Sequence, residues 1–230
     1  FNVKWIKNIN ELKNEHNIFI ANEFFDALPF KQFFKINNKW MERFVVVNKN
    51  NNKKFTKIFC NINKVEKKLG FQISKNQKVI EYSPLAIKYL KNISKKIYHK
   101  KGCLLIIDYG YLDNLMKDTM MSIRKHRYAN ILNTFGNSDI TYKLNFKILK
   151  KITKNLKLKC QAITSQRNFL ISLGIQQRAE ILSKNLPFSK KADIYYRLKK
   201  LIDKDQMGSL FKVMLITNKN TDFKTGFEID

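Results

Sequence analysis

The stretch EYSPLAIKYLKNISKKIYHKKGCLLIIDYG, residues 81–110, contains the pattern that decides the fold class. Ser83 is suited to cap a helix that begins at Pro84, and Gly102 is suited to end it. A continuous apolar run follows at once and ends in Asp108 and a glycine. A helix followed by a buried strand with an acidic residue at its carboxyl end is typical of an α/β protein whose sheet is mainly parallel.

Apolar patterns elsewhere in the chain extend this sheet. They predict three further strands, at residues 17–21, 158–164 and 209–217. The segment 31–80 differs, because its short apolar runs are separated by turns rich in Asn and Lys, which indicates a β-rich antiparallel insertion. We therefore expect one domain over residues 1–217, followed by a tail at 218–230 that lacks a periodic pattern and is frayed.

Polar side chains follow two of the predicted strands. Asn22, Glu23 and Asp26 come directly after the first strand, in the sequence NIFIANEFFDALPF, and Asp108 and Tyr109 end the 103–108 strand. Ligands of open α/β sheets bind outside the carboxyl ends of the strands, so the carboxylates are expected to face one cleft that suits a cationic substrate. The spacing is equally consistent with Glu23 or Asp26 capping the next helical turn.

The charge of the chain is strongly positive, with 45 Lys and Arg residues against 18 Asp and Glu residues and a formal net charge of +27. Such a charge is the usual property of a nucleic-acid-binding protein. The excess here is nearly all lysine and is spread over the whole chain, whereas recognition of bases and phosphates favours arginine. We favour compositional drift over a dedicated nucleic-acid surface.

Three cysteines, Cys60, Cys103 and Cys160, are far apart and odd in number. They predict free thiols in a reducing compartment, without disulfides or a zinc site. The longest apolar runs are too short to cross a bilayer. We expect a soluble, cytoplasmic protein, and the sequence contains no P-loop or G-x-S-x-G motif.

Six strings occur in a fixed order along the chain: ANEFFDALP, IIDYGY, DTMMSIRKHRY, SDIT, SQRNFLISLGIQQRA and MGSLFKVMLI. Together they resemble the MidA-like family of S-adenosylmethionine-dependent methyltransferases, which is related to a mitochondrial complex I assembly factor. The resemblance spans Trp5 to Ile216 and implies a class I, Rossmann-like methyltransferase fold with an antiparallel last strand. It also implies S-adenosyl-L-methionine as cofactor and a protein arginine as the methyl acceptor, such as one on a subunit of respiratory NADH dehydrogenase. A eukaryotic member of this kind would lie in the mitochondrial matrix.

The resemblance also assigns residues to the site. Carried over position by position, it implies that Asn22, Glu23, Asp26 and Asp108 are catalytic. It implies that seven further residues bind the substrate: Phe25, Pro29, Tyr109, Gly110, Arg124, His126 and Asp139. This chain has Asn145 where the family pattern has an Asp, which puts an acidic role at that position in doubt.

One family feature has no counterpart in this chain. The glycine-rich loop that cradles the methionine part of the cofactor is missing, because none of the seven glycines forms a G-x-G. The first predicted strand, at 17–21, already matches the family's fourth. We therefore expect a fragment, the C-terminal portion of the enzyme, that neither binds the cofactor nor transfers its methyl group alone. The alternative is a non-catalytic, basic binding or assembly protein that kept the fold and binds RNA or an anionic surface.

Overall fold

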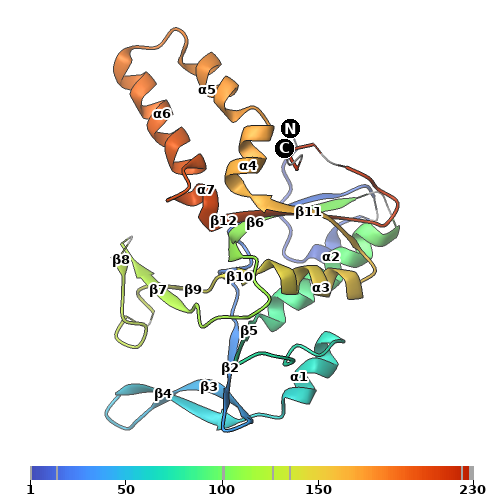
Figure 1. Cartoon of the computed structure of the whole chain (residues 1–230), viewed down its shortest axis with the longest axis vertical. Coiled ribbons are helices and arrows are strands. Elements are labelled where there is room, and N and C mark those ends of the chain that lie inside the picture. Colours follow the sequence, from blue (N-terminus) through green and yellow to red (C-terminus); the bar gives the residue numbers. More distant parts are fainter. Residues whose placement is uncertain are drawn as a thin grey trace.

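The computed structural model describes residues 2–13, 15–99, 102–125, 127–134, 136–223 and 225–227. Its central sheet (Figure 1) has the strand order β1-β6-β12-β11, and β10 pairs with the end of β6. The bounds are β1 Ile18–Asn22, β6 Cys103–Tyr111, β10 Leu144–Asn145, β11 Lys159–Ser165 and β12 Phe211–Thr217. β1 is parallel to β6, whereas β12 is antiparallel to both β6 and β11. The predicted mixed α/β fold with an antiparallel last strand is confirmed.

Two helices, α2 (Pro84–His99) and α3 (Phe146–Asn155), pack on one face of this sheet. Their apolar side chains contact Leu104 and Ile106 of β6, which are almost completely buried. The opposite face of β6 is only half-buried, because α4 and Phe227 cover it in part. The run at 103–107 is therefore apolar on both faces, although only one face is fully enclosed.

A second, antiparallel sheet lies in the region 31–82 (Figure 1). Its strands, in the order β4-β3-β2-β5, are β4 Lys53–Phe59, β3 Lys39–Val47, β2 Lys31–Ile36 and β5 Val79–Tyr82. Asn37 and Asn38 join β2 to β3 with φ angles of 46° and 59°, as the two central residues of a tight hairpin require. The short helix α1 (Ile62–Leu69) follows β4.

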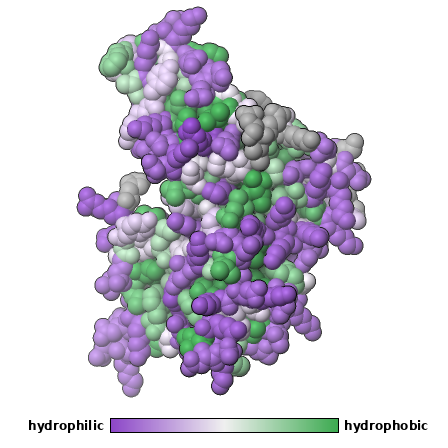
Figure 2. Space-filling model, in the orientation of Figure 1, coloured by the Kyte–Doolittle hydropathy of each residue, from purple (hydrophilic) through white to green (hydrophobic). Residues whose placement is uncertain are grey.

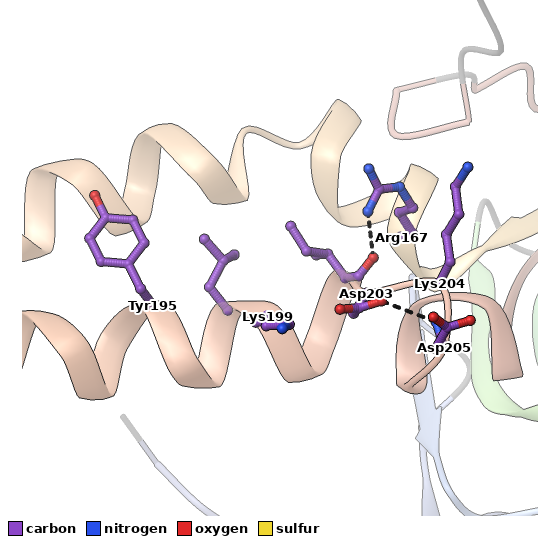
Figure 3. Close-up of a pocket in the computed structure, with 8 residues that line it drawn as sticks. Arg167, Tyr195, Lys199, Asp203, Lys204 and Asp205 are labelled. Atoms are coloured by element: carbon purple, nitrogen blue, oxygen red, sulfur yellow. Dashed lines mark hydrogen bonds between the residues drawn. The ribbon is translucent and has the colours of Figure 1, made fainter.

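Four helices form an arm that extends away from the central sheet (Figure 1). They are α4 Gln166–Ser172, α5 Ile175–Ser183, α6 Phe188–Ile202 and α7 Met207–Leu210. Arg167 fixes the base of the arm, because its Nη1 donates a hydrogen bond to the carbonyl oxygen of Ile202 over 2.7 Å. Asp203 and Asp205 lie beside this bond and line a hollow of about 520 Å³ (Figure 3).

The remaining elements are short. A three-stranded sheet consists of β7 Met121–Arg124, β8 Arg127–Tyr128 and β9 Asp139–Thr141, and a single 3-10 turn, η1, spans Ile9–Glu11. The expectation of a frayed tail is wrong at Phe227, because this side chain is 8% exposed and its ring lies 5.1 Å from that of Phe169. No helix in the described ranges is both long and apolar enough to cross a membrane. Hydrophilic side chains cover much of the face in Figure 2, with apolar surface among them.

Candidate functional site

The carboxyl ends of β1 and β6 lie side by side. Asn22 is the register partner of Ile107, and the amide of Glu23 donates a hydrogen bond to the Ile107 carbonyl oxygen over 3.0 Å. Glu23 has a φ of 48°, which is uncommon for a residue with a side chain. The chain thus leaves the sheet through a left-handed turn directly beside the last residues of β6.

Asp108 is buried and holds this turn in place. Its Oδ2 accepts hydrogen bonds from the amides of Phe25, at 3.0 Å, and Asp26, at 3.4 Å. Its Oδ1 accepts a third hydrogen bond from the amide of Tyr109, at 2.8 Å. Neither Glu23 nor Asp26 caps a helix, since no helix follows before β2. The capping alternative is therefore wrong, and the carboxylate that binds the turn's amides comes from the neighbouring strand.

Asp26 lies on the surface of this turn in a half-buried position. Its Oδ2 accepts a hydrogen bond from the hydroxyl of Thr141, on β9, over 2.9 Å. Its Oδ1 is buried and has no hydrogen-bond partner among the residues that the structure describes. An unpaired buried carboxylate oxygen is costly, and a bound donor would reach this oxygen only if the Asp26 side chain turned outward, because the oxygen is shielded from solvent.

Burial and nearby carboxylates raise the pKa values of two residues at the site. Burial, and then the nearby carboxylate of Asp26, raise the pKa of Asp108, while its three amide hydrogen bonds oppose the shift. The pKa of Tyr109 is also raised, by burial first and then by the proximity of Tyr128, Glu23 and Asp26. The carboxylates of Glu23 and Asp26 contribute to these shifts after burial, and a cation bound near them would oppose that contribution; a cationic substrate stays a prediction.

The structure brings together Glu23, Asp26 and Asp108 at the ends of β1 and β6, but it gives them different environments. Asn22, Glu23 and Pro29 are exposed at the surface, whereas Asp108 lies behind the turn and is 0% exposed. Asp108 therefore positions the turn. A direct contact between Asp108 and a substrate stays a prediction.

Two of the predicted substrate-binding residues have packing roles. Phe25 is 0% exposed and belongs to the main apolar core. Gly110 is buried where β10 pairs with β6 in parallel, and a Cβ atom there would lie 2.4 Å from Phe146 Cε2 and 2.5 Å from the Leu144 carbonyl oxygen. Only glycine permits this close approach of the two strands.

The predicted residues beyond β6 lie on the small sheet. Arg124 ends β7 and Asp139 begins β9, and both are exposed. Asp139 is the register partner of Ile123, so the two predicted residues come from neighbouring strands. His126 lies outside the described residues. The binding roles of Arg124 and Asp139 stay predictions.

Sequence reasoning missed Thr141, although it ends the string SDIT. It also missed a polar network centred on the buried side chains of Gln32 and Glu81. Glu81 accepts hydrogen bonds from Gln32 and from the amide and hydroxyl of Thr119, at 3.0 and 2.6 Å for the latter two. Gln32 also donates to Asp118, which forms an ion pair of 2.9 Å with Arg43. No sequence signal marks this network, because its members come from four separate segments.

An apolar hollow of about 380 Å³ adjoins the turn. Its lining includes Ala27, Leu28, Pro29 and Phe30 of the turn, together with Arg43 and Phe55 of the second sheet. The described residues contain no cluster of His, Cys, Asp and Glu suited to hold a metal ion.

Comparison with known proteins identifies the family. Residues 1–164 match the model of a family described as "Putative S-adenosyl-L-methionine-dependent methyltransferase". Because the match covers more than half of the chain, the chain belongs to this family.

Curated relatives and solved structures agree with this assignment. The mitochondrial protein arginine methyltransferase NDUFAF7 of Danio rerio is 26% identical over 216 residues, which are 94% of this chain and 51% of the relative. The Homo sapiens protein of the same name is 24% identical over 78% of this chain and 40% of its own length. The chain thus spans about half the length of the curated relatives it matches. A protein from Burkholderia thailandensis with bound S-adenosyl-homocysteine shares the fold, with a TM-score of 0.79, 21% identity, and coverage of 97% of this chain and 58% of its own.

Proposed function

We propose that this family member works as part of an S-adenosyl-L-methionine-dependent protein arginine methyltransferase, and that its 22–30 turn binds the acceptor arginine. The single observation that carries the acceptor assignment is the buried Oδ1 of Asp26, which has no hydrogen-bond partner in the described part of the chain. The names of the curated relatives support arginine as the acceptor. This chain covers only about half the length of those relatives, so the activity of the whole protein is itself part of the proposal.

Asp26 and Glu23 suit a guanidinium group. A guanidinium stays protonated at neutral pH and presents several N–H donors in a plane, which carboxylates bind best. In the proposal, the Asp26 side chain turns outward and its Oδ1 accepts one N–H of the acceptor. The exposed Glu23 side chain, which lies close enough to Tyr109 to raise its pKa, supplies a second carboxylate. Two such contacts would fix the direction of one guanidinium nitrogen, and alignment is the chief requirement of methyl transfer.

Asp108 would act as a positioning residue. Its hydrogen bonds to the amides of Phe25 and Asp26 fix the backbone that presents the Asp26 carboxylate. Misplacement of a reacting group by about an ångström can reduce a rate by about 100-fold. Asp108 would therefore affect the reaction through the position of Asp26, without contacting the substrate itself.

The cofactor supplies the methyl group from its sulfonium centre when it is bound. The acceptor side of the site fits this role, but the chain offers no G-x-G loop for the methionine part of the cofactor. We therefore assign no cofactor contact to a residue of this chain. The sequence resemblance favours a subunit of respiratory NADH dehydrogenase as the acceptor, and the mitochondrial relatives favour that compartment in a eukaryote.

The test compares two proteins, the chain alone and a chimera of the chain with the part of the Danio rerio relative that the match leaves out. Calorimetry measures binding of S-adenosylmethionine, and transfer of a labelled methyl group to arginine-containing peptides measures activity. We expect the chimera to bind and transfer, and the chain alone to do neither. Micromolar cofactor binding by the chain alone would contradict the expected fragment character.

Two substitutions separate binding from transfer in the chimera. Asp26→Asn and Glu23→Gln should leave cofactor affinity unchanged and lower methyl transfer, by about 100-fold for Asp26→Asn. Asp193→Asn, on the exposed surface of α6, is the matched control and should change neither quantity. Transfer that survives Asp26→Asn would exclude the proposed acceptor contact. Cofactor binding with transfer only to residues other than arginine would exclude arginine as the acceptor.

A further inference from the structure

A large groove lies between the second sheet and the helices α1 and α2. It has a volume of about 1110 Å³ and is lined by β2, β3 and β4, by both α1 and α2, and by the residues that connect them. Much of its floor is apolar, and includes Phe33, Phe44, Ile58, Val65, Leu69 and Ile87. Ile58 is 53% exposed and Phe44 is 39% exposed, so part of this floor is open to a partner.

Lysines of two helices border the floor. Lys64 and Lys68 come from α1, whereas Lys88, Lys91 and Lys95 come from α2, and all five side chains are exposed. In the described part of the chain, none of these five lysines forms an ion pair.

One acidic residue, Glu42, stands among the described lining residues. Its Oε1 already lies 2.5 Å from the Nζ of Lys31, so it is not available to the other lysines. The groove therefore combines an apolar floor with an uncompensated positive border.

The spacing of the lysines indicates the shape of the ligand charge. Lys88, Lys91 and Lys95 stand at i, i+3 and i+7 of one helix, so they form a row about 10 Å long at a rise of 1.5 Å per residue. Lys64 and Lys68 form a second row of one helical turn. A single anionic headgroup would neutralise one point of these rows. Carboxylates distributed along a helix, on either side of an apolar stripe, match both rows and the floor.

We propose that this groove is a docking site for an acidic amphipathic helix of a protein partner. The apolar face of that helix contacts Phe44 and Ile58, and its Glu and Asp side chains pair with the lysine rows. Burial of the apolar stripe supplies affinity, and the charges set orientation and the rate of association. The inference does not depend on methyl transfer, and it can be tested without cofactor.

The probe is a fluorescein-labelled synthetic peptide of about 18 residues, with Leu at helical positions i, i+3, i+4 and i+7 and Glu on both flanks. The control peptide has the same composition in an order that disperses the Leu residues around the helix. Fluorescence anisotropy with the 230-residue chain measures both affinities. We expect the probe to bind more tightly than the control peptide, and its affinity to fall as the salt concentration rises.

Matched variants separate the groove from the general positive charge. The triple variant Lys88→Glu, Lys91→Glu and Lys95→Glu should weaken probe binding by about tenfold or more. The control triple Lys190→Glu, Lys199→Glu and Lys200→Glu changes the net charge equally on α6 and should change the affinity by less than about threefold. Ile58→Ser, at an exposed floor position, should also weaken the probe while leaving the salt dependence intact.

Three results would overturn the proposal. Equal binding of the two peptides would show that the apolar floor is not used. Equal losses in the two triple variants would show that only the net charge matters. Tighter binding of phosphatidylglycerol vesicles or of single-stranded RNA, with the same loss in the Lys88, Lys91 and Lys95 variant, would assign the groove to another occupant. Circular dichroism checks that the triple variants fold, and Lys91→Glu alone gives a smaller effect in the same direction if the triple variant does not.

Discussion

Replacing Asp108 tests how much of the candidate site depends on one buried carboxyl group. The Asp108→Ala variant leaves the amides of Phe25 and Tyr109 without their acceptor, and these hydrogen bonds are 3.0 and 2.8 Å long. An unpaired buried N–H costs about 1–3 kcal/mol. The substitution also removes a buried carboxyl group whose ionised form is disfavoured by burial and by the nearby Asp26 carboxylate. This gain offsets part of the cost. We expect the free energy of unfolding to fall by about 2–4 kcal/mol.

The Asp108→Asn variant removes the titrating group and keeps one acceptor oxygen for the amides of Phe25 and Asp26, although its NH2 group then faces the amide of Tyr109. The pKa of Asp108 is raised in the folded protein, so the folded state holds this proton more tightly than the unfolded chain does. The stability that this proton contributes is complete below the unfolded-state pKa of about 3.9 and is lost as the pH rises through the folded-state pKa. The wild type should therefore lose stability relative to Asp108→Asn as the pH rises above about 4.

Urea denaturation, monitored by circular dichroism at several pH values between 4 and 9, measures all three proteins. Taking the difference between wild type and Asp108→Asn removes the contribution of the other titrating groups. Two results would refute the reasoning. One is a loss of less than about 0.5 kcal/mol in Asp108→Ala, since buried unpaired amides should cost more. The other is a wild type that gains stability over Asp108→Asn with rising pH.

Three further substitutions test the residues around the turn. Glu23→Gly should leave the stability unchanged or raise it by up to about 1 kcal/mol in a denaturant titration, because glycine adopts a positive φ without strain; a clear loss would contradict this. Gly110→Ala should destabilise by about 2 kcal/mol or more, since its Cβ would meet the buried ring of Phe146, and a thermal midpoint equal to that of the wild type would refute the packing argument. Thr141→Val removes the hydroxyl that binds Asp26, so in the active chimera methyl transfer should fall several-fold at unchanged cofactor affinity; unchanged transfer would show that this bond does not orient the carboxylate.

The sequence predicted the central sheet well because its strands have strong local signals. The apolar run at 103–107 and the helix before it are adjacent in the chain, and the pairing of β1 with β6 follows from this order. The short elements α1 and β5 were not predicted. α1 has only eight residues, and the four residues of β5 are a strand because they pair with β2, which lies 45 to 51 residues earlier in the chain.

The sequence predicted where the candidate site lies, but not what each of its residues does. The positions of Glu23, Asp26 and Asp108 after two strands were enough to place the three carboxylates near one another. No local pattern shows that Asp108 turns inward to the amides of residues 25 and 26, because these hydrogen bonds join positions 83 and 82 residues apart. The contact of Thr141 with Asp26 spans 115 residues and is likewise a property of the folded chain.

The turn after β1 combines three features that each lower stability. Glu23 has a left-handed backbone, Asp108 is an acid buried beside a second acid, and one oxygen of Asp26 is buried without a partner. Such features persist where the surrounding structure over-determines them, and they concentrate at functional sites. Glycine at position 23 and neutral residues at positions 26 and 108 would relieve these three costs wholly or in part. A guanidinium bound at Asp26 would supply the missing donors and a positive charge next to both acids, so a single ligand would offset the two electrostatic costs. Because one bound cation would lower both costs, there is a physical reason to regard the turn as a cation-binding site. The reason holds whether or not Asp108 itself contacts the ligand.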